Sequence, residues 1–268
     1  MWSDDGPLRY ERLTWPEVRR AAGEDRVALV PVATLEDHGP HLPVDTDLRI
    51  VSEICERAAT RAADRTVLLP AIPHGYDPHH MDFPGAITIA WDTFVRYCTD
   101  VGRSLAHHGF RRMLFLNGHG SNQNLVETAA RLVMVERPEV LAAAAFYLAS
   151  PAAFEVIGRV RSSTRGGMAH ACELETSIYL AIDPGAVAMD LAVDERSPAT
   201  PAAIGEILAD HGGGGPQTIC EHGTEEPKDE ASAIVFSMIC DLDLGRMWVA
   251  PGSPCVTAYE EVDLAGVV

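Results

Sequence analysis

The feature that most constrains the fold of this chain is an alternation of apolar strand-like runs and helix-like segments. Strands are expected at 26–33, 66–72, 111–118 and 139–147, and helices at 15–22, 47–63, 92–109, 122–136 and 169–182. The strand runs are continuously apolar, which is typical of a parallel sheet covered by helices on both faces. The sequence therefore predicts an α/β fold with a mostly parallel central sheet sandwiched by helices.

Several helix ends can be read from their capping residues. Thr14 followed three residues later by Glu17 forms a capping-box pattern for the first helix. Asp92 is a favourable N-cap for the helix at 92–109, and Gly109 suits the residue just after that helix. These signals support the element boundaries given above.

The chain after about residue 195 has a different composition. It is rich in proline, glycine and acidic residues up to about 232, and apolar strand-like runs follow at 233–244 and 246–255. A four-glycine run at 212–215 is read as a flexible turn. We therefore expect a domain over 1–195 and a short β-containing extension over 196–268, packed on it as a structural, lid or oligomer-contact element.

Charge and composition exclude several classes of partner. The formal net charge is −18, which argues against nucleic acid and against anionic membrane surfaces. The chain has no apolar run of about 18 residues and shows no secretory signal pattern. The six cysteines are scattered without a CxxC pair, so we expect reduced thiols in a cytoplasmic protein.

Titratable side chains crowd the loop that follows the first strand. The segment TLEDHGPHLPVDTD, at 34–47, contains Glu36, His38 and Asp47 among prolines that exclude a regular helix. Ligands of parallel α/β sheets bind beyond the carboxyl ends of the strands, where this loop lies. Imidazole and carboxylate groups are ligands for ions such as zinc and manganese. A solvated acidic loop is the alternative interpretation.

Two further clusters follow later elements. His119 lies between two glycines after the strand at 111–118, and Asn122 is placed to cap the next helix. His170 and Glu173 are three residues apart, which would put them on one face of a helix's first turn. Taken singly, these clusters could be a tight glycine turn and a surface contact.

Together the clusters predict a metal centre. Glu36, His38, Asp47, His119 and Glu173 provide two imidazoles and three carboxylates. Such a set suits a hydrolytic centre in which two ions activate a water molecule. His170 is left as a proton carrier, because a neutral histidine titrates near the working pH.

A segment rich in histidine lies at 75–89. Adjacent residues rarely face the same ion, so His79 and His80 are interpreted as part of a loop that lines the pocket entrance. We expect His80 and Phe83 to lie near the substrate. Ser121 and Asn122, which follow His119, are expected to contact the substrate as well.

These motifs resemble the creatininase, or creatinine amidohydrolase, family. The resemblance covers about residues 10–190 and rests on the segments at 36–47, 75–89, 117–122 and 170–177. It implies a binuclear zinc or manganese centre that hydrolyses a non-peptide or terminal C–N bond. It also implies that Glu36, His38, Asp47, His119 and Glu173 are the ligands, that Asp47 bridges the ions, and that His170 lies beside the substrate.

The chain departs from the creatininase pattern at three positions. Ser121 stands where true creatininases carry a glutamate, so Glu173 is expected to take over that ligand role. Gly166 replaces a tryptophan, and Cys172 occupies a position that is more usually glycine. The tail has its own resemblance, to the C-terminal end of autoproteolytic acyltransferase-type Ntn hydrolases, without the part that carries their nucleophile.

The sequence therefore predicts a metal-dependent amidohydrolase that cleaves a C–N bond of a small, possibly cyclic, amide. The expected cofactors are two divalent ions per chain, with zinc favoured over manganese or iron. Alternatives within the family are a formamide deformylase and a maturation peptidase that trims a peptide. An alternative of another class is a non-catalytic metal-binding scaffold. The resemblance also implies a homo-oligomer, often a hexamer.

Overall fold

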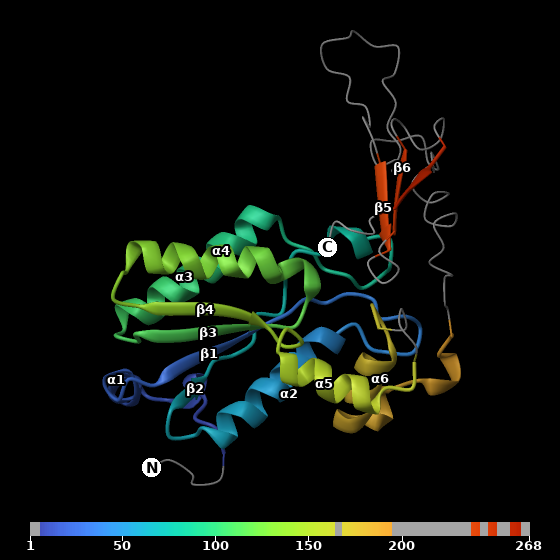
Figure 1. Ribbon diagram of the computed structural model, residues 1–268. Coiled ribbons are helices and arrows are strands. Elements are labelled where there is room, and N and C mark those ends of the chain that lie inside the picture. Colours follow the sequence, from blue (N-terminus) through green and yellow to red (C-terminus); the bar gives the residue numbers. More distant parts are fainter. Residues whose placement is uncertain (1–5, 164–167, 195–236, 242–245, 251–257, 264–268) are drawn as a thin grey trace. The chain divides into compact units, whose positions relative to one another are not determined.

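The computed structural model describes residues 6–163, 168–194, 237–241, 246–250 and 258–263 (Figure 1). The chain divides into two compact units, residues 1–194 and residues 195–268. The first unit contains every residue that is predicted to form the site.

A four-stranded parallel sheet forms the centre of the first unit. Its strands are β1 (Val27–Val32), β2 (Thr66–Leu68), β3 (Arg112–Asn117) and β4 (Leu141–Phe146), in the spatial order β2-β1-β3-β4. The predicted α/β fold with a mostly parallel sheet is thus confirmed. The central neighbours β1 and β3 pair in register through to their last residues. The segments that leave these two strands therefore start side by side.

Helices cover both faces of this sheet. They are α1 (Trp15–Gly23), α2 (Thr46–Arg61), α3 (Trp91–His107), α4 (Gln123–Glu136), α5 (Pro151–Val160) and α6 (Glu173–Ile182). In Figure 1, α3 and α4 lie over one face and α2 lies under the other. The helix α5 was not predicted from the sequence.

Alternate residues of β1 supply the core on the two faces. Val30 and Val32 are fully buried in the cluster that includes Phe94 of α3 and Val126 of α4. Leu29 packs on the opposite face, in a smaller cluster with residues of α2. This two-sided burial explains why the strand is apolar at every position.

The helix caps agree with the sequence except at α3. The capping box between Thr14 and Glu17 is present, and Gly109 has a positive φ of 98° after α3. Asp92 is not the N-cap of α3, because the helix begins at Trp91 and Ala90 occupies the cap position. Asp92 lies instead in the first turn, where the helix dipole still favours a carboxylate.

The second unit contains a three-stranded antiparallel sheet. Its strands are β5 (Ser237–Asp241), β6 (Arg246–Ala250) and β7 (Glu260–Asp263), in sequence order. β5 and β6 lie within the strand-like runs predicted at 233–244 and 246–255. The four-glycine run at 212–215, Cys220 and Cys255 lie outside the described residues, as does most of the tail's resemblance to Ntn hydrolases.

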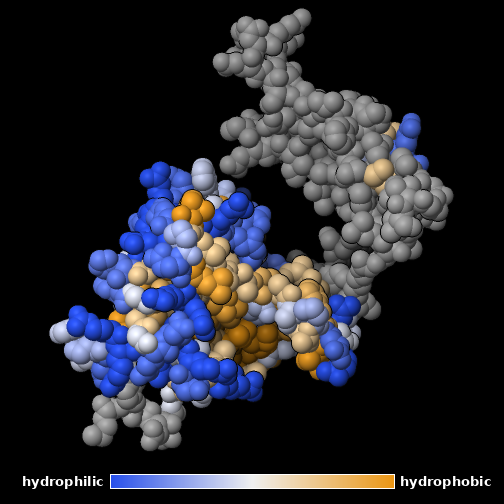
Figure 2. Space-filling model, turned by 60° about the vertical axis from the view of Figure 1, so that its left-hand side comes forward, coloured by the Kyte–Doolittle hydropathy of each residue, from blue (hydrophilic) through white to orange (hydrophobic). Residues whose placement is uncertain are grey.

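The face of the first unit seen in Figure 2 carries an apolar band between hydrophilic regions. Exposed large apolar side chains include Trp91 and Phe154. Over the described ranges, no helix has the length and apolar character that crossing a membrane requires.

Cys55, Cys98 and Cys172 are free thiols. Cys55 and Cys98 are fully buried in the helix-packed core. Burial raises the pKa of each of these two thiols to about 12. They therefore act as packing residues, as expected for reduced cysteines.

Candidate metal centre

The loop that leaves β1 carries Glu36 and His38 into the interior. The Glu36 N–H donates to the Val44 carbonyl at 3.1 Å, and His38 forms a bridge with Leu42. These backbone contacts close the loop on itself. The side chains of Glu36 and His38 are both almost fully buried, at 2% and 0% exposure.

Asp47 reaches the same point from the first turn of α2. The Thr46 hydroxyl donates to the Pro43 carbonyl at 2.6 Å, which fixes the entry of the chain into the helix. Asp47 is 4% exposed, and the N-terminal end of the helix dipole favours its negative charge. The prolines of the loop and the helix start together hold Asp47 beside Glu36 and His38.

His119 is held at the end of β3 by Asn117. The Asn117 amide donates to the His119 carbonyl at 2.6 Å and accepts from the His119 N–H at 3.1 Å. Between them, a Cβ on Gly118 would lie only 2.9 Å from the Val51 Cβ. Glycine is therefore needed for β3 to approach α2 closely enough to bring His119 to Asp47.

His119 joins two of the predicted carboxylates. Its Nδ1 lies 3.1 Å from Glu36 Oε1 and 3.0 Å from Asp47 Oδ2. We call this group the His119 position. Four of the five predicted ligands, Glu36, His38, Asp47 and His119, are thus brought together by the fold.

Glu175 supplies a third carboxylate beside Glu36 and Asp47. His38 Nε2 lies 3.5 Å from Asp47 Oδ1 and 3.7 Å from Glu175 Oε1, and these three residues form a group with metal-ligand spacing. We call it the His38 position. Glu175 also caps α6, because its Oε2 accepts the Cys172 N–H at 3.1 Å.

Glu173, the sequence-predicted ligand, does not lie in this group. Its carboxylate accepts the N–H groups of Ser162 and Ser163 at 2.6 and 2.7 Å. The sequence pattern predicts His170 and Glu173 in one helical turn, but α6 begins at Glu173, so His170 precedes the helix. The spacing of three residues therefore carries no information about which side chains share a face.

His170 lies at the edge of the cluster. Its side chain is 36% exposed, with Nδ1 3.9 Å from Glu36 Oε1 and Nε2 3.9 Å from Asp37 Oδ2. Its ring packs against those of His38 and His80, with centroids 4.4 and 4.5 Å away. Gly166, where the family pattern has a tryptophan, lies outside the described residues.

The loop at 75–89 does more than line the entrance of the pocket, because its side chains also contact the cluster. His80 Nδ1 lies 2.6 Å from Glu36 Oε2 and forms a 2.7 Å hydrogen bond with Asp77 Oδ1. Asp77 is fully buried and was not singled out from the sequence. Phe83 is 53% exposed on the same loop.

Asn122 and Ser121 differ in their surroundings. The Asn122 amide is fully buried, accepts the Tyr76 N–H at 2.9 Å and donates to the Ala33 carbonyl at 3.2 Å. It makes no side-chain cap on α4. Asn122 therefore ties the 75–89 loop to the end of β1. The Ser121 hydroxyl lies 3.4 Å from His79 Nε2, at the outer side of the cluster.

The buried charges strongly perturb one another. Burial raises the pKa of Glu36 to about 7. Burial opposes the charging of Asp47, but hydrogen bonding with His119 and the proximity of His38 lower its pKa to about 2. Burial likewise disfavours charged His38 and His119, yet the carboxylates around them raise both pKa values to about 10. Without metal, the two histidines therefore hold protons at positions where the surrounding carboxylates favour positive charge.

The donor set fits divalent metal ions. Several buried polar atoms of the cluster have no hydrogen-bond partner among the described residues. They are Asp77 Oδ2, His119 Nε2 and both ring nitrogens of His38. Unpaired buried lone pairs are costly, and coordination to a cation would satisfy them. Mixed imidazole and carboxylate ligands suit zinc, manganese or iron.

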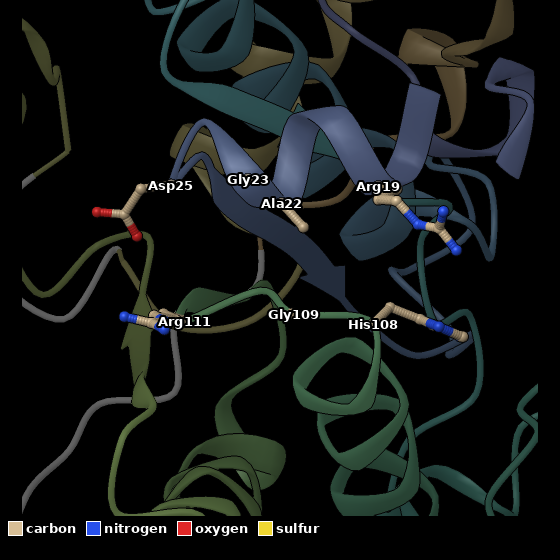
Figure 3. A pocket seen from close by; sticks show the side chains of 7 residues that line it. All are labelled: Arg19, Ala22, Gly23, Asp25, His108, Gly109 and Arg111. Atoms are coloured by element: carbon tan, nitrogen blue, oxygen red, sulfur yellow. The ribbon is translucent and has the colours of Figure 1, made fainter. Parts of the chain in front are cut away.

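A cleft of about 510 Å³ lies elsewhere in the first unit (Figure 3). It is lined by Arg19, Ala22, Gly23, Asp25, His108, Gly109 and Arg111. Asp25 and Arg111 come just before β1 and β3, so the cleft is at the amino ends of the strands. The acid, Asp25, is paired with Arg112 at 2.7 Å. Ligands of such sheets bind at the opposite ends, where the metal-ligating groups converge.

A parallel α/β sheet with imidazoles and carboxylates at its carboxyl edge defines the class of metal-dependent α/β hydrolases. A sequence model of the creatininase family, described as creatinine amidohydrolase, matches residues 11–233. The chain belongs to the creatininase family. The match extends past residue 195, the boundary expected from composition, into the second unit.

Known relatives share moderate identity with the chain. The mycofactocin precursor peptide peptidase of Mycobacterium ulcerans is 30% identical over 245 residues, which is 87% of this chain and 85% of that protein. The creatinine amidohydrolase of Pseudomonas putida is 29% identical over 202 residues, which is 70% of this chain and 76% of that protein.

Solved creatininase structures share the fold. A manganese form has a TM-score of 0.66 at 28% identity, and a zinc–zinc form has a TM-score of 0.65 at 27% identity. Each comparison covers 73% of this chain and 80% of the other. The protein is thus a hydrolase of the creatininase family, and side chains that could hold metal ions gather at the carboxyl ends of its strands.

Proposed function

We propose that this protein hydrolyses a C–N bond of a small amide at two divalent ions, one at the His38 position and one at the His119 position. The observation that carries this proposal is the convergence of buried carboxylates and imidazoles, several of whose nitrogens and oxygens lack hydrogen-bond partners among the described residues. Zinc is the expected ion, and the zinc and manganese forms of the solved relatives support either metal.

Asp47 would belong to both positions. Its Oδ1 faces His38 Nε2 at 3.5 Å, and its Oδ2 faces His119 Nδ1 at 3.0 Å. Because each oxygen is directed at a different imidazole, one carboxylate can serve two ions. When bound, such an ion pair lowers the pKa of a water molecule and polarises the substrate carbonyl.

His170 would carry the proton. Burial and the positive charge of nearby His38 lower the pKa of His170, so that its ring stays neutral at pH 7. A neutral imidazole can accept a proton and pass it to a departing nitrogen. The partial exposure of the ring leaves it in reach of a substrate that enters from solvent. His80 and Phe83, at the same opening, would contact that substrate.

A peptide is the second candidate substrate. The match to the precursor peptide peptidase spans more of this chain than the match to creatinine amidohydrolase, and this favours a chain-trimming activity. A small cyclic amide and a formamide remain the competing substrates. Release of an amino acid or short peptide would identify the peptidase, whereas release of formate would identify a deformylase.

The assembly and location of the protein follow from the sequence resemblance and composition. We infer a homo-oligomer in the cytoplasm, with the second unit as a structural, lid or subunit-contact element. A non-catalytic scaffold is disfavoured because carboxylate, imidazole and proton-carrier groups all stand at the cluster.

Elemental analysis of protein purified without chelator tests the proposed function. We expect about two transition-metal ions per chain, and cyclic amides, formamides and short peptides are then assayed with the loaded protein. Asp47→Asn should lose both ions and all hydrolysis. A full metal load in Asp47→Asn would overturn the assignment of Asp47, and failure of wild type to take up zinc or manganese would overturn the two-ion centre.

A further inference from the structure

We propose that Asp77 and His79 are additional ligands of the ion at the His119 position, so that the 75–89 loop binds metal directly. This inference rests on the proposed two-ion function. It goes beyond the sequence interpretation, in which this loop only lined the entrance.

Asp77 is directed into the cluster by its backbone. Its N–H donates to the Thr88 hydroxyl at 2.8 Å, and Gly75, two residues before it, pairs with Thr88 in a parallel bridge. A Cβ on Gly75 would lie 2.5 Å from the Asn122 amide and 2.8 Å from the Ala33 carbonyl. Glycine therefore allows the loop to lie against the end of β1, and this contact brings Asp77 inward.

The carboxylate of Asp77 is surrounded by imidazoles. Its Oδ1 lies 2.7 Å from His80 Nδ1, 3.4 Å from His79 Nδ1 and 3.8 Å from His119 Nε2. The residue has no exposed surface, and its Oδ2 has no hydrogen-bond partner within the described part of the chain. A buried carboxylate oxygen without a partner is costly unless a cation is bound there.

An ion pair with His80 alone does not account for this arrangement. It would use Oδ1 and leave Asp77 Oδ2 unpaired, although that atom is buried. One ligand atom from each of Glu36, Asp77, His79 and His119 lies within 4.8 Å of all the others. Two carboxylates and two imidazoles are a suitable set for zinc or manganese.

His79 would complete this set from the solvent side. Its side chain is 50% exposed, with Nδ1 toward Asp77 and Nε2 3.4 Å from the Ser121 hydroxyl. Metal-bound histidines commonly direct their second nitrogen to a polar partner that fixes the ring. Ser121, expected from the sequence to contact substrate, would then orient His79.

The test compares Asp77→Asn and His79→Ala with two controls. Asp82→Asn changes an exposed acid on the same loop, and His107→Ala changes an exposed histidine at the end of α3. Each protein is stripped, reloaded with cobalt(II) and titrated with a competing chelator. Metal content is measured by elemental analysis, and coordination is followed by the visible absorption of cobalt(II). None of these measurements depends on turnover.

We expect the controls to match wild type, with two ions per chain. Asp77→Asn and His79→Ala should each keep the ion at the His38 position and hold the other at least about 10-fold more weakly, with an altered cobalt spectrum. Two ions with wild-type affinity and spectrum in both variants would overturn this inference and leave the proposed function standing. Absence of metal from the wild-type protein would instead overturn the proposed function. Because His79 is exposed, His79→Ala should fold even if the substitution of buried Asp77 does not.

Discussion

Glu175 faces His38 across the site, with Oε1 3.7 Å from Nε2, while its Oε2 accepts the N–H of Cys172. One carboxylate thus caps α6 and reaches a metal position. Glu173, two residues earlier, points elsewhere and binds the N–H groups of Ser162 and Ser163. Residues two apart on a helix do not face the same direction, so only one of these acids can serve the site.

This relationship predicts different outcomes for two matched substitutions. Glu175→Gln should weaken metal binding at the His38 position by more than about 100-fold, because even changes outside the coordination shell cost about 10–100-fold. Glutamine can still cap the helix, so α6 should persist. Glu173→Gln should retain both ions. Elemental analysis after dialysis measures both, and metal loss confined to Glu173→Gln would show that the sequence-based ligand was right.

His170→Ala should separate metal binding from turnover. The ring touches the cluster only at distances near 3.9 Å, so both ions should remain bound. Hydrolysis should fall by about 10²–10⁴-fold, the usual contribution of a positioned proton carrier. Steady-state rates and metal content on the same preparations check this, and unchanged kcat would remove His170 from the proton path.

The metal-free protein should lose stability as the pH rises from about 6.5 to about 10. The folded-state pKa values of His38 and His119 are raised to about 10, so their stabilising contribution is complete below 6.5 and disappears as pH passes 10. Glu36 acts in the same direction at lower pH, because burial raises its pKa from 4.5 to about 7 and its contribution is lost between these two values.

Thermal unfolding with and without chelator measures this dependence. The melting temperature of the chelator-treated protein should fall across the window, and that of the zinc-loaded protein should fall less, since bound ions take the place of the protons. His38→Gln should flatten the metal-free profile. A metal-free melting temperature that rises with pH would contradict the pKa directions.

Residues that are placed by the ends of strands could be predicted from the sequence. Residues that are placed by tertiary contacts could not. Glu36 and His119 could be predicted because continuous apolar runs mark β1 and β3, and parallel strands end at one edge. Glu175 was missed because the start of α6 was placed before His170, which made Glu173 look like the inward acid.

Asp77 had no pattern that could reveal it. It lies in an irregular segment without periodicity, and its burial depends on the close approach of Gly75 to Asn122 and Ala33. A glycine three residues after a proline-flanked strand end is too common to indicate such a contact. The neighbouring His79 and His80 both direct Nδ1 at Asp77 Oδ1, at 3.4 and 2.7 Å, and spacing along the chain could not indicate this.

Gly118 should tolerate substitution poorly. An added Cβ would lie 2.9 Å from the Val51 Cβ and 3.1 Å from the Asp47 carbonyl, so β3 and α2 would have to separate. We expect Gly118→Ala to cost about 1–3 kcal/mol in the free energy of unfolding, as overpacking does. Gly120→Ala is the matched control, because a Cβ there meets nothing within 4 Å.

Since His119 follows Gly118 directly and meets Asp47, the separation of β3 from α2 should also lower metal affinity in Gly118→Ala and not in Gly120→Ala. Urea unfolding and a chelator competition on both variants test this link, and a destabilised Gly118→Ala protein with wild-type metal affinity would mean that the packing of β3 on α2 does not position His119.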